Sequence, residues 1–455
     1  MKSAIVTAVD NDFVSTSPQE SVNPPATQPT LTLTYPDKLF CHATITIPQA
    51  TVNVLYHQAA ITQQHTIQTY GFTRGEVPLD YIKHNFKENL IEHIKEFLLK
   101  QMVIAFLYQQ IRTKKIAVAG SARLINIEVE LDRDAEFIFE LTQAPIIAIE
   151  NWKYFPFKAP KRKNYKDLDR QVDSFLAYEK EQLAKHNQEN GLQLGDWVSF
   201  DLCIVDQENR ILPEQLPQHF WFKLSSQDGE GTLRENFLNK KAAETFFTDN
   251  GSLQEFFSTE LETNYTFRIS IFDVIPHTYF CIEQFKAHFR LKTNKEVHQK
   301  LIEVFSFRND VCLRRAMVEE TLKLLTAKNP FTVPTHLIAR QEEIILEKVQ
   351  ESPDYNVYRT QKDFHARIKE LAERQTREEI LLDQLAYHEN LAVSDNEVKN
   401  YLSFFNRPRM KEFIYCEFPS HKVQGQEVPI PTEFVKNYCL REKMVNHLIY
   451  YLTKK

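Results

Sequence analysis

The hydrophobic positions in the first 150 residues alternate between strand-like and helix-like spacing. Residues 39 to 47 have the β-branched, partly alternating character of a strand, and Pro48 ends that strand and can begin a helix. The helix is predicted over residues 49 to 69. Apolar residues then recur every three or four positions from 82 to 111, which predicts a long helix, straight or kinked. Residues 116 to 141 return to strand spacing, so this region reads as an α+β domain.

A second group of strand-like runs begins after Gly195. The runs cover residues 197 to 205, 219 to 224 and 265 to 274, and a helical or irregular excursion lies at 233 to 260. Separated strands with one such excursion predict a small α+β domain in the middle of the chain.

The region from 278 to 455 carries mainly helical signals. Thr293 with Glu296, and Ser394 with Glu397, fit capping boxes, in which a hydroxyl and a carboxylate satisfy free amides of the first helical turn. The apolar stripes are narrow and the other faces are dense in charge, which favours elongated helical arms over one thick core. The predicted fold class is therefore α+β multidomain, with two α+β domains followed by an elongated all-α C-terminal domain.

Length and composition point to a cytoplasmic protein. The 455 residues are enough for about two to four domains with their own cores. The six cysteines are scattered, which is typical of free thiols in a reducing compartment. The most apolar stretch, residues 102 to 108, is far shorter than the about 20 residues that cross a bilayer, so no membrane partner is expected. Residues 1 to 34, rich in Ser, Thr, Pro, Asn and Gln, are expected to form a disordered tail.

Charge and motifs exclude several classes of function. A formal net charge of −6 argues against bulk binding of polyanions, and we expect no DNA partner. The sequence has no glycine-rich phosphate loop followed by Lys-Ser/Thr, no H-E-x-x-H arrangement and no G-x-S-x-G elbow. We therefore predict no cofactor, no metal site and no catalytic nucleophile.

The connector between the two α+β domains leaves two interpretations open. Between residues 151 and 166 cations are interleaved with aromatic residues and no acid occurs. Such a segment can bind RNA. It is also typical of a solvated linker whose aromatic side chains fix it to a neighbouring domain.

One loop stands out because it contains two of only nine glycines in the chain. Two glycines four residues apart, followed by a proline that opens an amphipathic segment, predict a tight loop between two helices with an aromatic and a cation at its tip. Taken alone, this loop is either an ordinary turn between helices or a docking site. Its residues are Gly71, Phe72, Thr73, Arg74, Gly75, Glu76, Val77 and Pro78.

The loop and the order of domains around it resemble the trigger factor family of ribosome-associated bacterial chaperones. In that family the loop reads Gly-Phe-Arg-x-Gly-x-x-Pro. The resemblance extends over nearly the whole chain from about residue 36, through the helix after the loop, the segment at 117 to 120 and the segment at 329 to 338. The loop residues that match are Gly71, Phe72, Gly75 and Pro78.

The resemblance implies that the loop docks at the nascent-chain exit of the large ribosomal subunit, on a protein of the exit site and on rRNA. Thr73 stands where the family has arginine, and Arg74 takes the next place. Because each cation that meets a phosphate adds to affinity, we expect docking that is weaker and more sensitive to salt.

The middle domain then corresponds to the family's FKBP-like prolyl isomerase domain, in a degenerate form. Leu202 occupies an aromatic position of the family, and its glycine-aromatic-glutamate element is not recognisable in residues 232 to 238. Prolyl rotation needs an apolar pocket that holds the twisted amide, so we expect no catalytic residues and an inactive site. Phe220, Phe222 and Phe267 are either remnants of that pocket or ordinary core.

The sequence thus predicts an ATP-independent holdase for nascent or unfolded polypeptides, tethered to the ribosome through the 71 to 78 loop. Two alternatives stay open: an active prolyl cis/trans isomerase of FKBP type, and an assembly chaperone that works without the ribosome. The expected organisation is a tail at 1–34, a ribosome-binding-like domain at 35–150, a linker with a helix at 151–190, the FKBP-like domain at 191–277, and a helical client-binding domain at 278–455.

Overall fold

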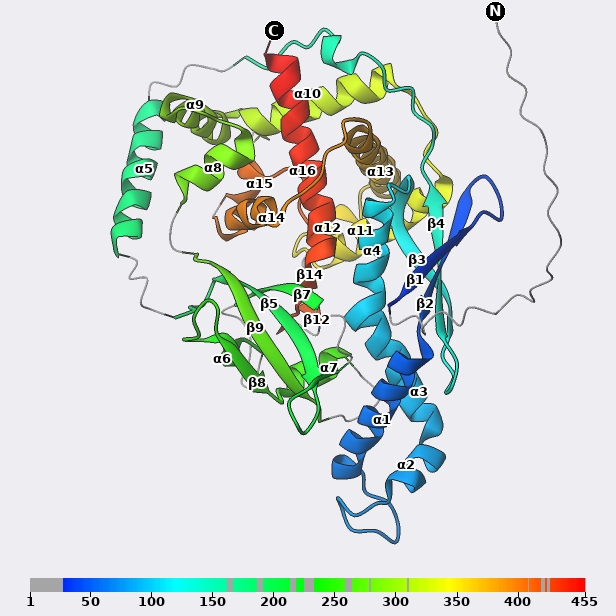
Figure 1. The fold of residues 1–455 in the computed structure, drawn as a ribbon. Helices are drawn as coiled ribbons and strands as arrows, with labels where there is room; N and C mark the ends of the chain where they lie inside the picture. Colours follow the sequence, from blue (N-terminus) through cyan, green and yellow to red (C-terminus); the bar gives the residue numbers. More distant parts are fainter. Residues whose placement is uncertain are drawn as a thin grey trace, which may run out of the picture.

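A computed structural model describes most of the chain, and Figure 1 shows how its parts are arranged. A sheet with a projecting helical arm, a second sheet and a group of helices lie around the long C-terminal helix. The described residues are 28–161, 167–185, 191–212, 218–224, 233–257, 264–277, 280–308, 311–407, 409–418, 422–423 and 426–454.

The first sheet is antiparallel and has the strand order β1-β2-β4-β3. Strand β2 pairs with β4 along its whole length, from Phe40 opposite Thr142 to Ile47 opposite Ala135. Alternate residues of both strands are buried, as expected when one face of a sheet packs on a core. The strands are β1 (Thr30–Thr34), β2 (Phe40–Ile47), β3 (Val118–Glu128) and β4 (Ala135–Gln143).

Strand β1 corrects the expected extent of the N-terminal tail. The prediction placed residues 30 to 34 in a disordered segment, but they pair antiparallel with β2, Thr30 opposite Thr46 and Thr34 opposite His42. The Thr-Leu-Thr-Leu-Thr sequence alternates polar and apolar residues, and this period of two is what a half-buried strand needs. Residues 1 to 27 of the expected tail lie outside the described part of the chain.

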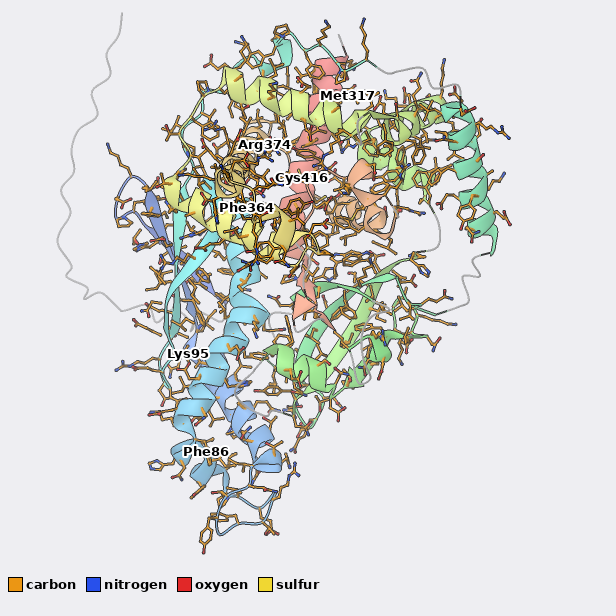
Figure 2. All side chains as sticks on the ribbon, turned by 180° about the vertical axis from the view of Figure 1, so that it is seen from behind. Phe86, Lys95, Met317, Phe364, Arg374 and Cys416 are labelled. Atoms are coloured by element: carbon orange, nitrogen blue, oxygen red, sulfur yellow. The ribbon has the colours of Figure 1, made fainter. Side chains whose placement is uncertain are left out.

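The helices between β2 and β3 form an arm that extends away from the rest of the molecule (Figure 1). The long helix predicted after the loop is kinked: it is interrupted at Phe86, and a π-helical stretch at Leu99–Val103 separates its last two segments. Phe86 and Lys95 lie on this arm in Figure 2. The helices are α1 (Gln49–Thr66), α2 (Leu79–Asn85), α3 (Lys87–Leu98) and α4 (Ile104–Thr113).

The second sheet has the strand order β14-β7-β5-β9-β8, with the short strand β6 beside β5. Its strand β14 (Ile430–Pro431) comes from the C-terminal region, where the sequence predicted only helices, and pairs with β7. The other elements are β5 (Trp197–Val205), β6 (Ile211–Leu212), β7 (Gln218–Lys223), α6 (Leu233–Phe237), β8 (Thr245–Thr248), α7 (Gly251–Phe257) and β9 (Thr266–Ile275).

The C-terminal region is dominated by helices, as predicted, and its two predicted capping boxes are present at Thr293 and Ser394. Short strands occur at β10 (Phe307–Arg308), β11 (Val311–Cys312), β12 (Lys422–Val423) and β13 (Gln426–Glu427). The helices, with the connector helix α5, are α5 (Leu168–Lys185), α8 (Ile282–Phe289), α9 (Asn294–Phe305), α10 (Leu313–Lys328), α11 (Thr335–Gln350), α12 (Tyr355–Tyr358), α13 (Phe364–His388), α14 (Asp395–Leu402), α15 (Met410–Phe413) and α16 (Thr432–Thr453).

These helices share three separate apolar clusters instead of one thick core. One cluster joins α11 and α13 to β3 of the first sheet. There Gly120, at a φ of +70°, leaves room for Leu337, whose Cδ2 lies 2.8 Å from the position a Cβ would take. The segments at 117 to 120 and 329 to 338, which both resemble the family, therefore contact each other.

The connector is fixed to the C-terminal helices by an aromatic side chain. Trp152 is buried, its indole N–H donates to Glu389 at 3.0 Å, and Lys153 pairs with the same carboxylate at 2.6 Å. The Trp152 ring also lies against His447 and Tyr451 of α16. This contact supports the linker interpretation over RNA binding for the start of the segment.

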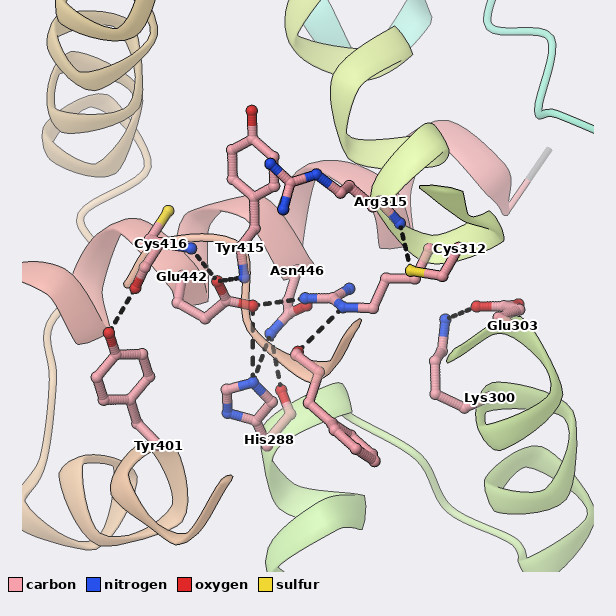
Figure 3. A network of polar contacts seen from close by, with 12 residues as sticks. His288, Lys300, Glu303, Cys312, Arg315, Tyr401, Tyr415, Cys416, Glu442 and Asn446 are labelled. Carbon is pink, nitrogen blue, oxygen red and sulfur yellow. Dashed lines mark hydrogen bonds and ion pairs between the residues drawn. The ribbon is translucent and has the colours of Figure 1, made fainter. Parts of the chain in front are cut away.

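A buried ion pair joins three parts of the C-terminal region (Figure 3). The Glu442 carboxylate on α16 accepts from the Arg314 guanidinium on α10 and from the backbone N–H groups of Tyr415 and Cys416, both at 2.9 Å. The Arg314 Nε donates to the Phe413 carbonyl at 3.1 Å. Burial alone would raise the pKa of Glu442, but Arg314 and His288 outweigh burial and lower that pKa to about 2.

Candidate functional site

The 71 to 78 loop lies at the far end of the arm, between α1 and α2 (Figure 1). Gly71 and Gly75 have φ angles of +90° and +88°, a backbone conformation that side chains with a Cβ rarely adopt. The base of the loop is fixed to α1, because Gln64 donates to the Val77 carbonyl at 2.8 Å and the Val77 side chain is buried. The loop is therefore a defined turn anchored at its base.

Phe72 is presented at the surface of the tip. Its side chain is 39% exposed, and its ring centroid lies 5.2 Å from that of Tyr81 on α2. Its backbone N–H donates to the Thr69 carbonyl at 3.3 Å. One face of the ring is thus held by α2 while the rest is open to a partner.

The two polar residues at the centre of the loop behave differently. The Thr73 hydroxyl donates to the Glu76 carboxylate, so the residue that replaces the family's arginine is bound to an acid. Arg74 is exposed, and its Nε donates to the His65 carbonyl at 3.2 Å at the end of α1. Pro78 ends the loop and directly precedes α2, where a missing backbone N–H costs nothing.

The structure adds one residue to this tip that the sequence interpretation did not include. Tyr70, which precedes the first glycine of the loop, is fully exposed. An aromatic residue directly before a loop glycine was a signal in the sequence.

Phe220, Phe222 and Phe267 of the middle sheet are fully buried. They belong to one apolar core, in which the Phe222 and Phe237 centroids lie 5.7 Å apart, as do those of Phe267 and Phe257. Such packing is typical of core residues.

The arm packs beside α7 on the same face of the middle sheet. Phe97 on α3 is buried against Phe257 and Tyr265, with centroid separations of 5.2 and 5.8 Å. The His93 Nε2 and the Tyr265 hydroxyl are 2.6 Å apart, and Gln101 donates to the Leu202 carbonyl at 3.0 Å. Buried residues of the arm and of the middle sheet therefore form one continuous apolar core.

Burial determines the ionisation of the pair at this junction. It lowers the pKa of the His93 imidazole to about 4 and raises that of the Tyr265 hydroxyl. Both groups are neutral at physiological pH, so their hydrogen bond joins two uncharged side chains across the junction.

The opposite face of the middle sheet carries a hydrogen-bonded series that sequence motifs did not reveal. Ser199 Oγ lies 2.8 Å from His219 Nε2, and His219 Nδ1 lies 2.9 Å from Asp201 Oδ1. Strand pairing sets this geometry, since Asp201 is directly opposite His219. Ser199 is only 1% exposed, so we assign the series to cross-strand bonding and not to nucleophilic catalysis.

A search of the described residues finds no group of three or more His, Cys, Asp or Glu side chains that could hold a metal ion. Among the same residues, none of the helices has the length and hydropathy required to span a bilayer.

Comparison with known proteins identifies the family on both sides of the middle sheet. Residues 30–176 match the N-terminal family model of bacterial trigger factor protein, and residues 295–407 match the model of its C-terminus. The trigger factor of Rickettsia massiliae is 20% identical over 438 residues, which cover 90% of each chain. That of Salinibacter ruber is 21% identical over 371 residues, or 76% of this chain and 78% of the relative.

A solved structure of the trigger factor chaperone, from work on substrate recognition in folding and assembly, aligns with 92% of this chain and 99% of its own. Its sequence identity is 15% and its TM-score is 0.36. The two family models together include the loop, the first sheet and most of the C-terminal helices. The chain therefore belongs to the trigger factor family and is a ribosome-associated holdase chaperone.

Proposed function

We propose that this chaperone docks beside the nascent-chain exit of the large ribosomal subunit through the tip of its arm, on an exit-site protein and adjoining rRNA. The observation that carries the proposal is the position of the tip residues. Phe72 and Arg74 are exposed on a glycine-closed turn at the far end of a projecting helical arm. An exposed aromatic ring beside a cation can contact an apolar protein surface and a phosphate group at the same time.

With Thr73 bound to Glu76, the affinity of this docking is lower than it would be with an arginine at position 73. At position 73 a neutral hydroxyl bound to a carboxylate stands in place of a cation. The expected affinity therefore depends on Phe72 for apolar contact and on few cations for the phosphates.

Changing Phe72 and Arg74 together to alanine should remove most co-sedimentation with ribosomes at low salt. The unmodified protein should bind at low salt and dissociate as salt rises, because its phosphate contacts release counterions. A matched control changes Tyr178 and Lys180 of α5, an exposed aromatic and cation away from the tip, and should bind like the unmodified protein. If the loop variant and the control bind equally, the loop is only a turn.

A proline-containing tetrapeptide should isomerise no faster with the protein than without it. Phe220, Phe222 and Phe267 are buried, and α6, α7 and the arm pack on their face of the sheet. The measurement is the rate of cis-to-trans conversion at rising protein concentration, with an active FKBP-type isomerase as the positive control. A rate proportional to protein concentration would establish the isomerase alternative.

We further propose a division of labour along the chain in a cytoplasmic chaperone. The part from 35 to 150 tethers the molecule, while 191 to 277 and the helices of 278 to 455 present surface to unfolded or nascent polypeptides. Exposed apolar side chains such as Ile344, Val357 and Tyr358 on these helices support weak contacts that do not depend on client sequence.

A further inference from the structure

The middle sheet ends in an edge strand whose backbone is open on one side. Strand β8 is last in the sheet order, and among the described strands it pairs only with β9. Its sequence, Thr-Phe-Phe-Thr, contains no proline and no charge, which are the usual protections of an edge.

The register shows which backbone groups point outward. Ile271 donates its N–H to the Glu244 carbonyl at 2.9 Å, just before β8 begins. In an antiparallel pair, residues bonded to the partner alternate with residues directed away from it. Phe246 and Thr248 thus bond to β9, while Thr245 and Phe247 direct their N–H and C=O groups to the open side.

An aromatic side chain lies beside this open backbone. Phe247 of β8 is 50% exposed, whereas Phe272 of β9, which is 52% exposed, lies beyond the residues that pair with β8, and its ring centroid is 5.3 Å from that of His219. By alternation both project from the face opposite the apolar core, in which Phe267, Ile269 and Ile271 are buried. An extended chain at the edge would meet main-chain donors and acceptors together with an apolar surface.

We infer that β8 binds an extended segment of an unfolded client polypeptide as an added strand. The inference rests on the holdase function, because such a client has unpaired backbone N–H and C=O groups that match those of Thr245 and Phe247. Main-chain bonds do not depend on client sequence, as a general chaperone requires. The core face of the sheet packs against α6, α7 and the arm, so the edge gives this sheet a binding site that needs no pocket.

Amide hydrogen exchange on the unmodified protein tests the inference without ribosomes. The probe is reduced, carboxymethylated α-lactalbumin, which stays unfolded in buffer. Exchange at Thr245 and Phe247 should slow in its presence, while the amides of Phe246 and Thr248, already bonded to β9, should change little. Unchanged exchange at Thr245 and Phe247 under saturating client would overturn the inference.

Three variants separate backbone pairing from aromatic contact. Phe247→Pro removes an outward N–H and the ring, and should weaken client binding in fluorescence anisotropy by about fivefold to tenfold. Phe247→Thr keeps the N–H and should weaken it by only about twofold. Phe272→Thr, which removes an exposed ring outside the paired length of β8, is the control and should bind nearly as the unmodified protein.

Two other results would contradict the inference. Equal losses for Phe247→Pro and Phe247→Thr would show contact through the ring alone and contradict strand addition. A concentration-dependent dimer that Phe247→Pro abolishes would place a second copy of the chain at the edge and overturn the client assignment. Circular dichroism and exchange at β9 check that each variant is folded.

Discussion

Replacing Glu442 with alanine is expected to lower the free energy of unfolding by about 3–5 kcal/mol. The substitution leaves the buried Arg314 guanidinium without its anion, and the backbone amides of Tyr415 and Cys416 lose their acceptor. Urea-induced unfolding followed by far-ultraviolet circular dichroism measures the change. The loss should be concentrated in the C-terminal helices, because α10, α15 and α16 meet at this carboxylate.

Two comparisons make this result specific. Glu92→Ala removes an exposed ion pair with Lys95 on the arm and should cost less than about 1 kcal/mol. The double variant Arg314→Met with Glu442→Leu should recover part of the loss, since it removes both charges from the interior. If Glu442→Ala unfolds at the same urea concentration as Glu92→Ala, the buried pair contributes nothing to stability.

The same carboxylate gives the protein a defined acid sensitivity. The pKa of Glu442 is lowered from 4.5 to about 2 in the folded state, so its contribution to stability is complete above about pH 4.5 and is lost as pH falls toward 2. Burial also lowers the pKa of His288, whose contribution is lost as pH falls below its unfolded value of 6.5. Glu442→Gln should therefore flatten the acid side of the stability profile.

Phe97→Ala is expected to cost about 3–5 kcal/mol and to loosen two regions at once. The ring is buried between the arm and the middle sheet, against Phe257 and Tyr265. Because these regions share one core, amide exchange should rise together in α3 and in β9. Chemical denaturation gives the total loss, and exchange resolved by residue gives its distribution.

The control for Phe97→Ala is Tyr70→Ala, which removes a fully exposed aromatic from the same arm. It should change stability by less than about 0.5 kcal/mol. Faster exchange in α3 without a change in β9 would mean that the arm and the middle sheet unfold independently.

Much of the fold followed from local patterns in the sequence. The strand ending at Pro48, the helix after it and the two capping boxes at Thr293 and Ser394 depend on residues near one another in the chain, and all are present. The predicted turn at Gly71 and Gly75 likewise has its positive φ angles. Periodicity and capping chemistry are local, so they are readable without a partner.

The remaining features depend on contacts between distant residues. Nothing near Ile430 indicates that two residues pair with Trp221 and Phe220 in another sheet. The Ser199–His219 contact is also set by how separate elements meet. The core shared by the arm and the middle sheet also could not be predicted, because Phe97 and Tyr265 each look like ordinary core residues of their own domain.

Strand β14 has a consequence for how the protein itself is made. The middle sheet receives this strand from residues that come directly before α16. During synthesis, β7 leaves the ribosome long before its partner at Ile430 exists, so its outer edge stays unpaired until the segment around Ile430 has been made. A chaperone that receives nascent chains thus depends on a non-local pairing to complete its own fold, and such pairing predicts slow final assembly.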